Sequence, residues 1–302
     1  MMCLFVYTLF AYFSFIPVSF QTSVEEACIV KEFEEVNNVI NNCEDIILDN
    51  LDIPGGDQLI LNLSEGSTLT FRGNTSFNFY EWTGPLMTIS GNNIKVIGEK
   101  DSVIDGRGPL WWDGQGTWGS KKPRLLKIQV TNAVFDGINI KDCPSLCAMV
   151  NGDNLVIKNW FINILEGDEG VAPENKFAHN TDGLHLEHYY SNENVTIENC
   201  VIYNQDDCIA IARDAKNYGI SVEQNYLNLP AGQPQDGPPS NHIPIYNLSM
   251  QNIYGNVLSG GIPVFILCAD EGCFDWKWEN VNILGDNQNN NCTGYAPEQY
   301  EC

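Results

Sequence analysis

Basic residues are scarce in this sequence. Its 302 residues include 15 Lys and Arg against 39 Asp and Glu, which gives a formal net charge of -24. A surface this negative repels nucleic acids and anionic membranes, so the sequence predicts neither as a partner. The same charge keeps a secreted protein in solution, and by itself it identifies no function.

Cysteine spacings typical of zinc sites are also missing. None of the eleven cysteines belongs to a Cys-x-x-Cys pair or a Cys/His zinc motif. Disulfides are therefore favoured over a metal site. Proximity along the chain predicts three local disulfides, and these are Cys28–Cys43, Cys268–Cys273 and Cys292–Cys302.

Long apolar runs are absent beyond the first 21 residues, MMCLFVYTLFAYFSFIPVSFQ. No Lys or Arg precedes this run, but Pro17, Ser19 and the polar continuation favour a cleaved signal peptide over a membrane anchor. We expect residues 1–22 to be the signal peptide, residues 23–302 the mature domain, and the protein to be extracellular without a membrane anchor after cleavage. Five Asn-x-Ser/Thr sequons are typical of a glycosylated secreted protein, and they begin at Asn62, Asn74, Asn194, Asn247 and Asn291.

Heptad repeats are absent, and the sequence predicts a single helix. That helix covers 23–43, where apolar residues recur at roughly helical spacing and acidic residues crowd the first turns. The rest of the chain consists of short segments with alternating apolar residues, separated by Gly, Asn and Asp. The pattern predicts an all-β protein with a short N-terminal helix.

Several of the short segments share one pattern: apolar–x–apolar, a polar or Gly turn residue, then apolar–x–apolar. Their spacing predicts a parallel β-helix, in which stacked coils bury one apolar column and the N-terminal helix caps its open end. A β-sandwich is the alternative, but the hairpin turns that it requires, such as 151–152, are scarce. The repeating segments are 133–140, 155–164, 195–204, 248–256 and 278–285.

Two acidic motifs lie one predicted coil apart. HNTDGLHL contains Asn180 and Asp182, and NQDDCIAI contains Gln205, Asp206 and Asp207. Each motif precedes an alternating strand, so stacking about 4.8 Å apart would bring the carboxylates together. Carboxylates that close cannot all titrate normally, and a protonated acid beside ionised neighbours is what glycoside hydrolysis requires. Ordinary turns and calcium binding are the alternatives.

Longer stretches of the chain match one family in their order and cover nearly all of the mature sequence. They are VIDGRGPLWWDG (103–114), KKPRLLKI (121–128), NTDG (180–183), NQDDCIAI (204–211), GISVEQNY (219–226) and FILCADEGCFDWKWENV (265–281). In these stretches the sequence resembles the polygalacturonases, secreted glycosidases with a right-handed parallel β-helix. The resemblance implies a monomer that hydrolyses α-1,4-galacturonosyl bonds of pectin, or polygalacturonic acid, with inversion and without a metal or organic cofactor.

The resemblance also implies roles for the acidic motifs. Asp206 is expected to be the general acid, and Asp182 and Asp207 to hold and deprotonate the attacking water. Inverting enzymes keep their carboxyl groups about 6.5–9.5 Å apart, a gap that we expect to find between coils. Asn180 and Gln205 are expected to orient the acids.

Two more positions enter through the resemblance. Tyr226 matches a tyrosine that lines the substrate cleft, although packing in the core is an alternative role for it. His185 stands where the family commonly has an acidic residue, and we interpret it as a substitution beside the acids.

Two motifs of the family are absent from the chain. In the family, the His of Gly-His-Gly hydrogen-bonds the acid site, and the cations of Arg-Ile-Lys bind the sugar carboxylate. After Ile211 the chain instead continues with residues that resemble sequence from farther downstream in the family. We therefore expect the chain to be shortened after about residue 212 by roughly three coils. Arg213 and Lys216 could replace the lost cations, or they could be solvated loop charges.

The shortening has further consequences. The resemblance implies that Cys208 has lost its usual partner, so that, if it pairs at all, it pairs with Cys200, Cys143 or Cys147.

Three functions stay open: an active polygalacturonase, a pectin-binding protein without catalysis, and a shortened product of a gene for an active enzyme. Each coil of a solenoid contacts only its neighbours, so we expect the fold to survive the loss.

Overall fold

The structure is a computed structural model that describes residues 28–168, 171–187, 191–211, 216–218, 221–223, 226–229, 245–257, 262–285 and 290–302. The predicted signal peptide and Arg213 lie outside these residues. Within the described part of the chain, no helix has the length and apolar character needed to cross a bilayer.

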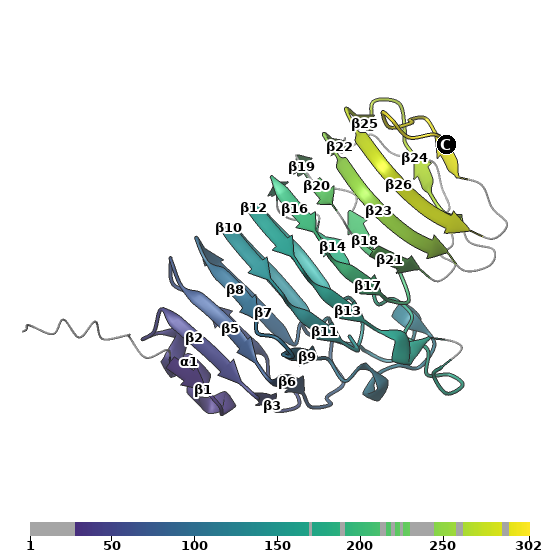
Figure 1. Ribbon diagram of the computed structural model, residues 1–302. Helices are drawn as coiled ribbons and strands as arrows, with labels where there is room; N and C mark the ends of the chain where they lie inside the picture. The colour runs from purple at the N-terminus through teal and green to yellow at the C-terminus, as the bar shows by residue number, and fades with distance from the viewer. Residues whose placement is uncertain are drawn as a thin grey trace, which may run out of the picture.

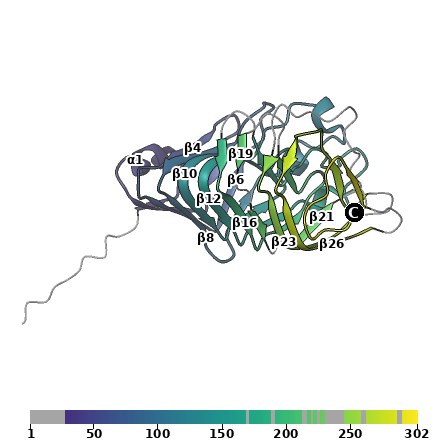
Figure 2. The same ribbon diagram turned by 90° about the horizontal axis from the view of Figure 1, so that it is seen from above.

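The chain forms a right-handed parallel β-helix, as the sequence predicted (Figure 1). Coils follow one another from the purple N-terminal end to the yellow C-terminal end, and the view from above shows the two ends of the solenoid far apart (Figure 2). The strands of the main sheet are β1 (Cys28–Val30), β2 (Asp45–Asp49), β3 (Asp52–Ile53), β4 (Leu59–Asn62), β5 (Thr68–Arg72), β6 (Asn74–Phe77), β7 (Met87–Asn92), β8 (Lys95–Gly98), β9 (Val103–Asp105), β10 (Leu126–Asp136), β11 (Asn139–Lys141), β12 (Ala148–Lys158), β13 (Phe161–Asn163), β14 (Leu184–Leu186), β16 (Val195–Glu198), β17 (Val201–Tyr203), β18 (Ile209–Ile211), β20 (Ser221–Glu223), β21 (Tyr226–Leu229), β23 (Ser249–Val257) and β26 (Lys277–Gly285).

Smaller elements complete the coils. Two further sheets are parallel as well, and short 3-10 helices occupy some of the connections between strands. The strands of these sheets are β15 (Ser191–Glu193), β19 (Lys216–Tyr218), β22 (Ile245–Tyr246) and β25 (Cys273–Phe274) in one, and β24 (Phe265–Leu267) and β27 (Asn291–Thr293) in the other. The 3-10 helices are η1 (Phe33–Glu35), η2 (Gly108–Leu110), η3 (Gly116–Trp118) and η4 (Leu165–Gly167).

The core is a column of apolar side chains that face the axis in register. Successive side chains of a strand point to opposite faces, so alternating apolar residues place one face inside every coil. Burying each large side chain contributes roughly 1.5–3 kcal/mol. One such column, in which no residue is more than 1% exposed, consists of Ile46, Leu69, Val96, Phe135, Ile157 and Ile197.

Asparagines form a ladder at the turns between strands. Asn132, Asn154 and Asn194 have φ of 53°, 53° and 55°, a left-handed conformation that Asn tolerates better than most residues. Their side-chain amides donate to Asn92, Asn132 and Asn154 respectively, at 2.9–3.0 Å. The Asn residues noted at the predicted turns therefore hold adjacent coils in register.

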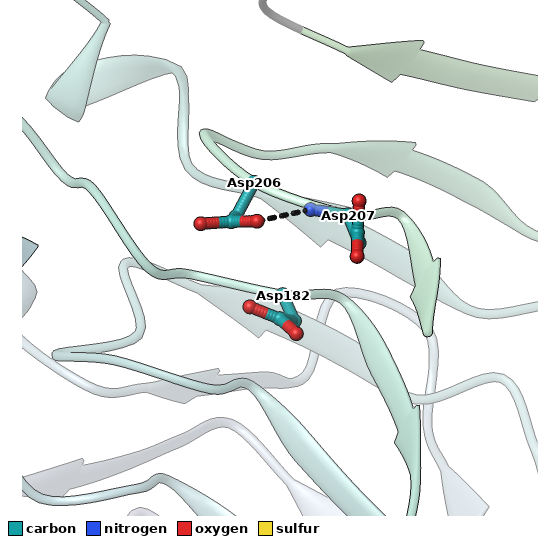
Figure 3. Close-up of side chains that lie close together, drawn as sticks. All are labelled: Asp182, Asp206 and Asp207. Carbon is teal, nitrogen blue, oxygen red and sulfur yellow. Dashed lines mark hydrogen bonds between the residues drawn. The ribbon is translucent and has the colours of Figure 1, made fainter. Parts of the chain in front are cut away.

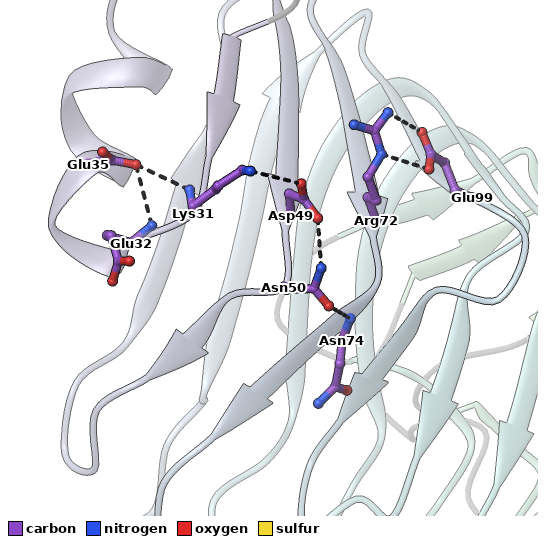
Figure 4. A network of polar contacts seen from close by, with 8 residues as sticks. All are labelled: Lys31, Glu32, Glu35, Asp49, Asn50, Arg72, Asn74 and Glu99. Atoms are coloured by element: carbon purple, nitrogen blue, oxygen red, sulfur yellow. Dashed lines mark hydrogen bonds and ion pairs between the residues drawn. The ribbon is translucent and has the colours of Figure 1, made fainter.

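The N-terminal cap is shorter than the sequence predicted. Of the helix expected over 23–43, the structure describes 28–43, and in that part only α1 (Val36–Ile40) is α-helical, preceded by η1, while β1 joins the sheet by pairing with β2. The backbone hydrogen bonds to β2 override the helical spacing of the apolar residues. Glu35 accepts the backbone N–H of Lys31 and Glu32 at the start of the helical segment (Figure 4).

Surface pairs link the first coils. Lys31 lies 3.8 Å from Asp49, and Arg72 donates two hydrogen bonds to Glu99 on the next coil, at 2.9 and 2.7 Å (Figure 4). Both pairs lie at the surface, where water screens the charges, so we expect them to contribute little to stability.

Disulfides confirm the three predicted local pairs, Cys28–Cys43, Cys268–Cys273 and Cys292–Cys302. A fourth joins Cys143 to Cys147, so the two alternatives that paired Cys208 with either of these residues are wrong. The two cysteines lie close enough in the turn before β12 to bond each other. The thiol of Cys208 donates to Asn204 Oδ1 at 3.1 Å.

Stacking continues past the point where the sequence is expected to be shortened. Strand β20 pairs with β16 on one side and β23 on the other, and β21 likewise pairs with β17 and β23. The coil after residue 211 thus has neighbours on both sides, as expected for a solenoid in which each coil contacts only its neighbours.

Candidate active site

The acidic motifs occupy equivalent positions on adjacent coils. Asp182 lies two residues before β14, and Asp207 lies two residues before β18, whose strands pair Leu184 with Ile209. The backbone N–H of Gly183 donates to the carbonyl of Asp207 at 2.9 Å. The register between the coils therefore sets how close the acids lie.

The three carboxylates form one cluster. One oxygen from each of Asp182, Asp206 and Asp207 can be chosen so that all lie within 4.8 Å of one another. Figure 3 shows Asp182 on one turn, facing the other two on the next. The backbone N–H of Asp207 donates to Asp206 Oδ1 at 2.9 Å. Asp182 is buried, Asp206 is partly exposed and Asp207 is exposed.

The stacking of the coils brings the oxygens close together. Adjacent coils lie about 4.8 Å apart, so equivalent turns on neighbouring coils place their side chains near one another. The separation of about 6.5–9.5 Å between carboxyl groups stays a prediction. Oxygens at this spacing can share one water molecule, since each hydrogen bond to it spans about 2.7–2.8 Å.

The cluster raises the pKa of two of its members. Loss of hydration, followed by the negative charge of Asp182, raises the pKa of Asp206 to about 6, although backbone N–H groups of Asp207 and Asn180 oppose the rise. Loss of hydration and Asp182 also raise the pKa of Asp207, and the charge of His185 works against this. Asp206 therefore retains a proton into mildly acidic pH.

His185 contacts the cluster directly, which the sequence did not reveal. It lies on β14, and its Nδ1 is 2.9 Å from Asp182 Oδ2. A carboxylate accepts hydrogen bonds, so Nδ1 is the donor. The side chains of His185 and Asp182 are 24% and 11% exposed, so water competes little for this contact. Its position three residues after Asp182 was the available sequence signal.

Two buried residues beside the acids fix the turns that carry them. Asn204 donates from Nδ2 to the carbonyls of Thr181 and Asp207, at 3.0 and 2.8 Å. Thr181 donates to the carbonyl of Ala178 at 2.8 Å and accepts the backbone N–H of Gln205 at 3.1 Å. Both residues belong to the acidic motifs, but the sequence alone predicted no role for Asn204 or Thr181.

The predicted substrate-binding residues fall into two groups. Asn180 and Gln205 lie beside the acids, and the backbone N–H of Asn180 hydrogen-bonds Asp206. The side chain of Asn180 accepts a hydrogen bond from Thr117 at 2.5 Å, so a distant loop reaches the site. Tyr226 begins β21, and Lys216 begins β19; both side chains lie outside the described residues.

A divalent cation is the other occupant that three carboxylates allow. Calcium takes six to eight oxygen ligands, and three carboxylates supply at most six oxygens even if each binds through both. Backbone N–H groups of Asp207 and Asn180 also point at Asp206, where a cation would be repelled by their partial positive charge. The arrangement favours sharing of protons over binding of calcium.

Comparisons with known proteins agree on one family. The sequence model of glycosyl hydrolases family 28 matches residues 43–218 and 212–302. A polygalacturonase from Phaedon cochleariae is 30% identical over 357 aligned residues, which cover 92% of this chain and 94% of that protein. A polygalacturonase from Penicillium janthinellum is 31% identical and covers 83% of this chain and 84% of its own.

Solved structures share the fold. Endopolygalacturonase I from Stereum purpureum, complexed with two galacturonate, has a TM-score of 0.62 and 23% identity, covering 88% of this chain and 99% of its own. A polygalacturonase from Erwinia carotovora ssp. carotovora has a TM-score of 0.55 and 16% identity, covering 88% and 96%. At these identities the likeness establishes the parallel β-helix alone.

Proposed function

The chain belongs to glycosyl hydrolases family 28, and on this premise we propose that it is a secreted polygalacturonase that hydrolyses α-1,4-galacturonosyl bonds of pectin with inversion. One observation carries the proposal: the cluster of Asp182, Asp206 and Asp207 on adjacent coils. The polygalacturonase relatives support the reaction. The galacturonate complex of the related fold supports the substrate.

Each acid has a role that its surroundings favour. Asp206, with a pKa of about 6, keeps a proton that it can donate to the glycosidic oxygen. Asp182 and Asp207 lie close enough to hold one water between them and to take its proton as it attacks the sugar carbon. The backbone contact from Asn180 positions Asp206, and the turn that carries Gln205 is fixed by Thr181.

We also propose that the chain is secreted and internally shortened. Secretion is supported by the apolar segment before residue 22 and by the sequons, and four disulfides are typical of an oxidising compartment. Shortening is supported by the two family matches, which meet at 212–218. An alignment of 357 positions with a chain of 302 residues also requires gaps.

The proposal is tested by the products of hydrolysis. Purified protein is mixed with oligogalacturonate, reducing ends are counted, and the first products are followed by proton NMR before mutarotation. We expect reducing ends to appear and the new end to be the β-anomer, since the bond cleaved is α. A new α-anomer would contradict inversion and show instead a retaining reaction through a covalent intermediate. Enzymes of that type usually have carboxyl groups about 5–5.5 Å apart. Binding to pectin without new reducing ends would instead favour a non-catalytic protein.

Replacing His185 is expected to affect both rate and pH dependence. The change His185→Ala removes the donor to Asp182 and the positive charge beside Asp207. A hydrogen bond to a charged group contributes about 1.5–3 kcal/mol, so we expect kcat to fall about 10-fold or more. The pKa of Asp207 should rise, which moves the acidic limb of the kcat profile to higher pH.

His185→Asn is the matched control because it keeps an N–H donor without the charge. We expect this variant to recover part of kcat but not the position of the acidic limb. Wild-type profiles in both variants would mean that His185 only fills space. Kinetics at several pH values, with thermal melting to verify folding, provide the measurement.

A further inference from the structure

A tryptophan on a loop that contacts Asn180, next to the acid cluster, is almost wholly exposed. Trp118 ends η3 in the connection between β9 and β10, and it is 91% exposed. Other aromatic side chains of this connection are buried, among them Trp111 and Trp112. A tryptophan face kept in water contributes nothing to the core, whereas it can bury 150–250 Å² against a ligand.

The loop that carries Trp118 is held by an internal ion pair. Lys122, whose side chain is only 4% exposed, lies 2.7 Å from Asp113 Oδ1. Its ammonium group also donates to the carbonyls of Gly116 and Ser120, at 3.0 and 3.2 Å. Asp113 in turn accepts the backbone N–H of Ser120 at 2.7 Å and that of Gln115 at 3.0 Å. These contacts within the loop fix its backbone on both sides of Trp118.

The same loop is tied to the acid site. Thr117, the neighbour of Trp118, donates from Oγ1 to Asn180 Oδ1 at 2.5 Å. Gly116 packs so closely that a Cβ there would lie 3.2 Å from His179 Cβ. The backbone N–H of Asn180 hydrogen-bonds Asp206. Two hydrogen bonds therefore connect the residue next to Trp118 with the proposed general acid.

We propose that Trp118 is a stacking platform for a galacturonate ring of the pectin chain, next to the ring whose bond is cleaved. This rests on the proposed function. The occupant is a sugar chain, because a polymer cleaved at Asp206 must extend past the neighbouring loops. Stacking on the apolar face of a pyranose ring needs no positive charge. In a protein with net charge -24, such a contact adds affinity for an anionic polymer and offsets part of the repulsion between them.

The test measures oligogalacturonate binding in a variant that does not hydrolyse its ligand. In an Asp206→Asn background, oligogalacturonates of increasing length are titrated by calorimetry into the parent and into Trp118→Ala, Trp118→Phe and Leu284→Ala. Leu284 is the matched control, since it is 60% exposed on β26, far along the solenoid. We expect Trp118→Ala to weaken binding of the longer oligomers about 10-fold and leave galacturonic acid unaffected. Trp118→Phe should retain most of the affinity, and Leu284→Ala all of it.

Activity and stability separate the platform from a structural role. In the active protein, Trp118→Ala should raise KM about 10-fold with kcat and the melting temperature unchanged. Equal affinities in all variants, while the wild type hydrolyses pectin, would overturn the platform and leave the proposed function standing. If the wild-type sequence neither hydrolyses nor binds oligogalacturonate, both fail.

Discussion

Asp206→Asn is expected to lower the rate of pectin hydrolysis by about 10²–10⁴-fold without unfolding the protein. An amide has nearly the shape of a carboxyl group and can still accept the backbone N–H of Asp207, but it has no proton to give to the leaving oxygen. Reducing-sugar release at pH 5 measures the loss. Asp207→Asn is the matched comparison, one residue away and also in the cluster.

The two variants should differ in a diagnostic way. Asp207→Asn removes a group that holds water, so we expect its rate to fall while an alkaline limb persists, displaced to lower pH because the charge of Asp207 helps to raise the pKa of Asp206. In Asp206→Asn the residual rate should lack that limb. A rate for Asp206→Asn within about twofold of wild type would contradict the role of Asp206 as general acid.

The Asp206→Asn substitution should also stabilise the protein at neutral pH, because the folded protein holds the ionised Asp206 carboxylate in unfavourable surroundings. Asp206 has a pKa of about 6 when folded against 3.8 as its ordinary value. The folded state therefore binds more protons than the unfolded state, and stability falls as pH rises from about 4 through 6. The ionised carboxylate destabilises the fold at pH 7.5 by on the order of 2–3 kcal/mol. Urea unfolding of Asp206→Asn should show this gain at pH 7.5 and lose most of it at pH 4.

The second large effect is the pH dependence of the wild type. Since Asp206 acts in its protonated form and has a pKa of about 6, kcat/KM should fall tenfold per pH unit well above 6, reaching about 1% of its maximum at pH 8. Below the maximum, protonation of Asp207, whose pKa is raised, should also reduce the rate. The expected profile is a bell with its maximum below pH 6.

Hydrolysis of a soluble oligogalacturonate across pH 3.5–8.5, at constant ionic strength, measures this profile. Constant ionic strength matters because the substrate and the protein are both anionic. Equal kcat/KM at pH 5 and pH 8 would exclude a general acid with the pKa assigned to Asp206.

Local sequence patterns were enough to predict the fold and the cluster. Alternation of apolar residues has a period of two, and it places one face of each strand inside whatever the coil lengths are. That is why a column such as Phe135, Ile157 and Ile197, which lie in three of the predicted repeating segments, could be anticipated. The acids could be anticipated too, since Asp182 and Asp207 precede their strands by the same two residues.

Other features depended on contacts that a local pattern does not record. The helix predicted over 23–43 is shorter in the structure because β1 pairs with β2. Thr117 reaches Asn180 across 63 residues, so the loop that presents Trp118 could not be placed beside the acids from sequence. The spacing of the carboxylates follows from the stacking of the coils and not from their separation in the chain.

The sequence by itself therefore determined which side chains face the core, which strands are preceded by acids and which family the chain resembles. Only the tertiary structure decided the contact of His185 with Asp182, the approach of one oxygen of each acid to within 4.8 Å, and the contact of the loop that carries Trp118 with Asn180. The physical reason is that the direction of a side chain is fixed by its own backbone. Its neighbours on the next coil are fixed by register, which turns and long-range hydrogen bonds set together.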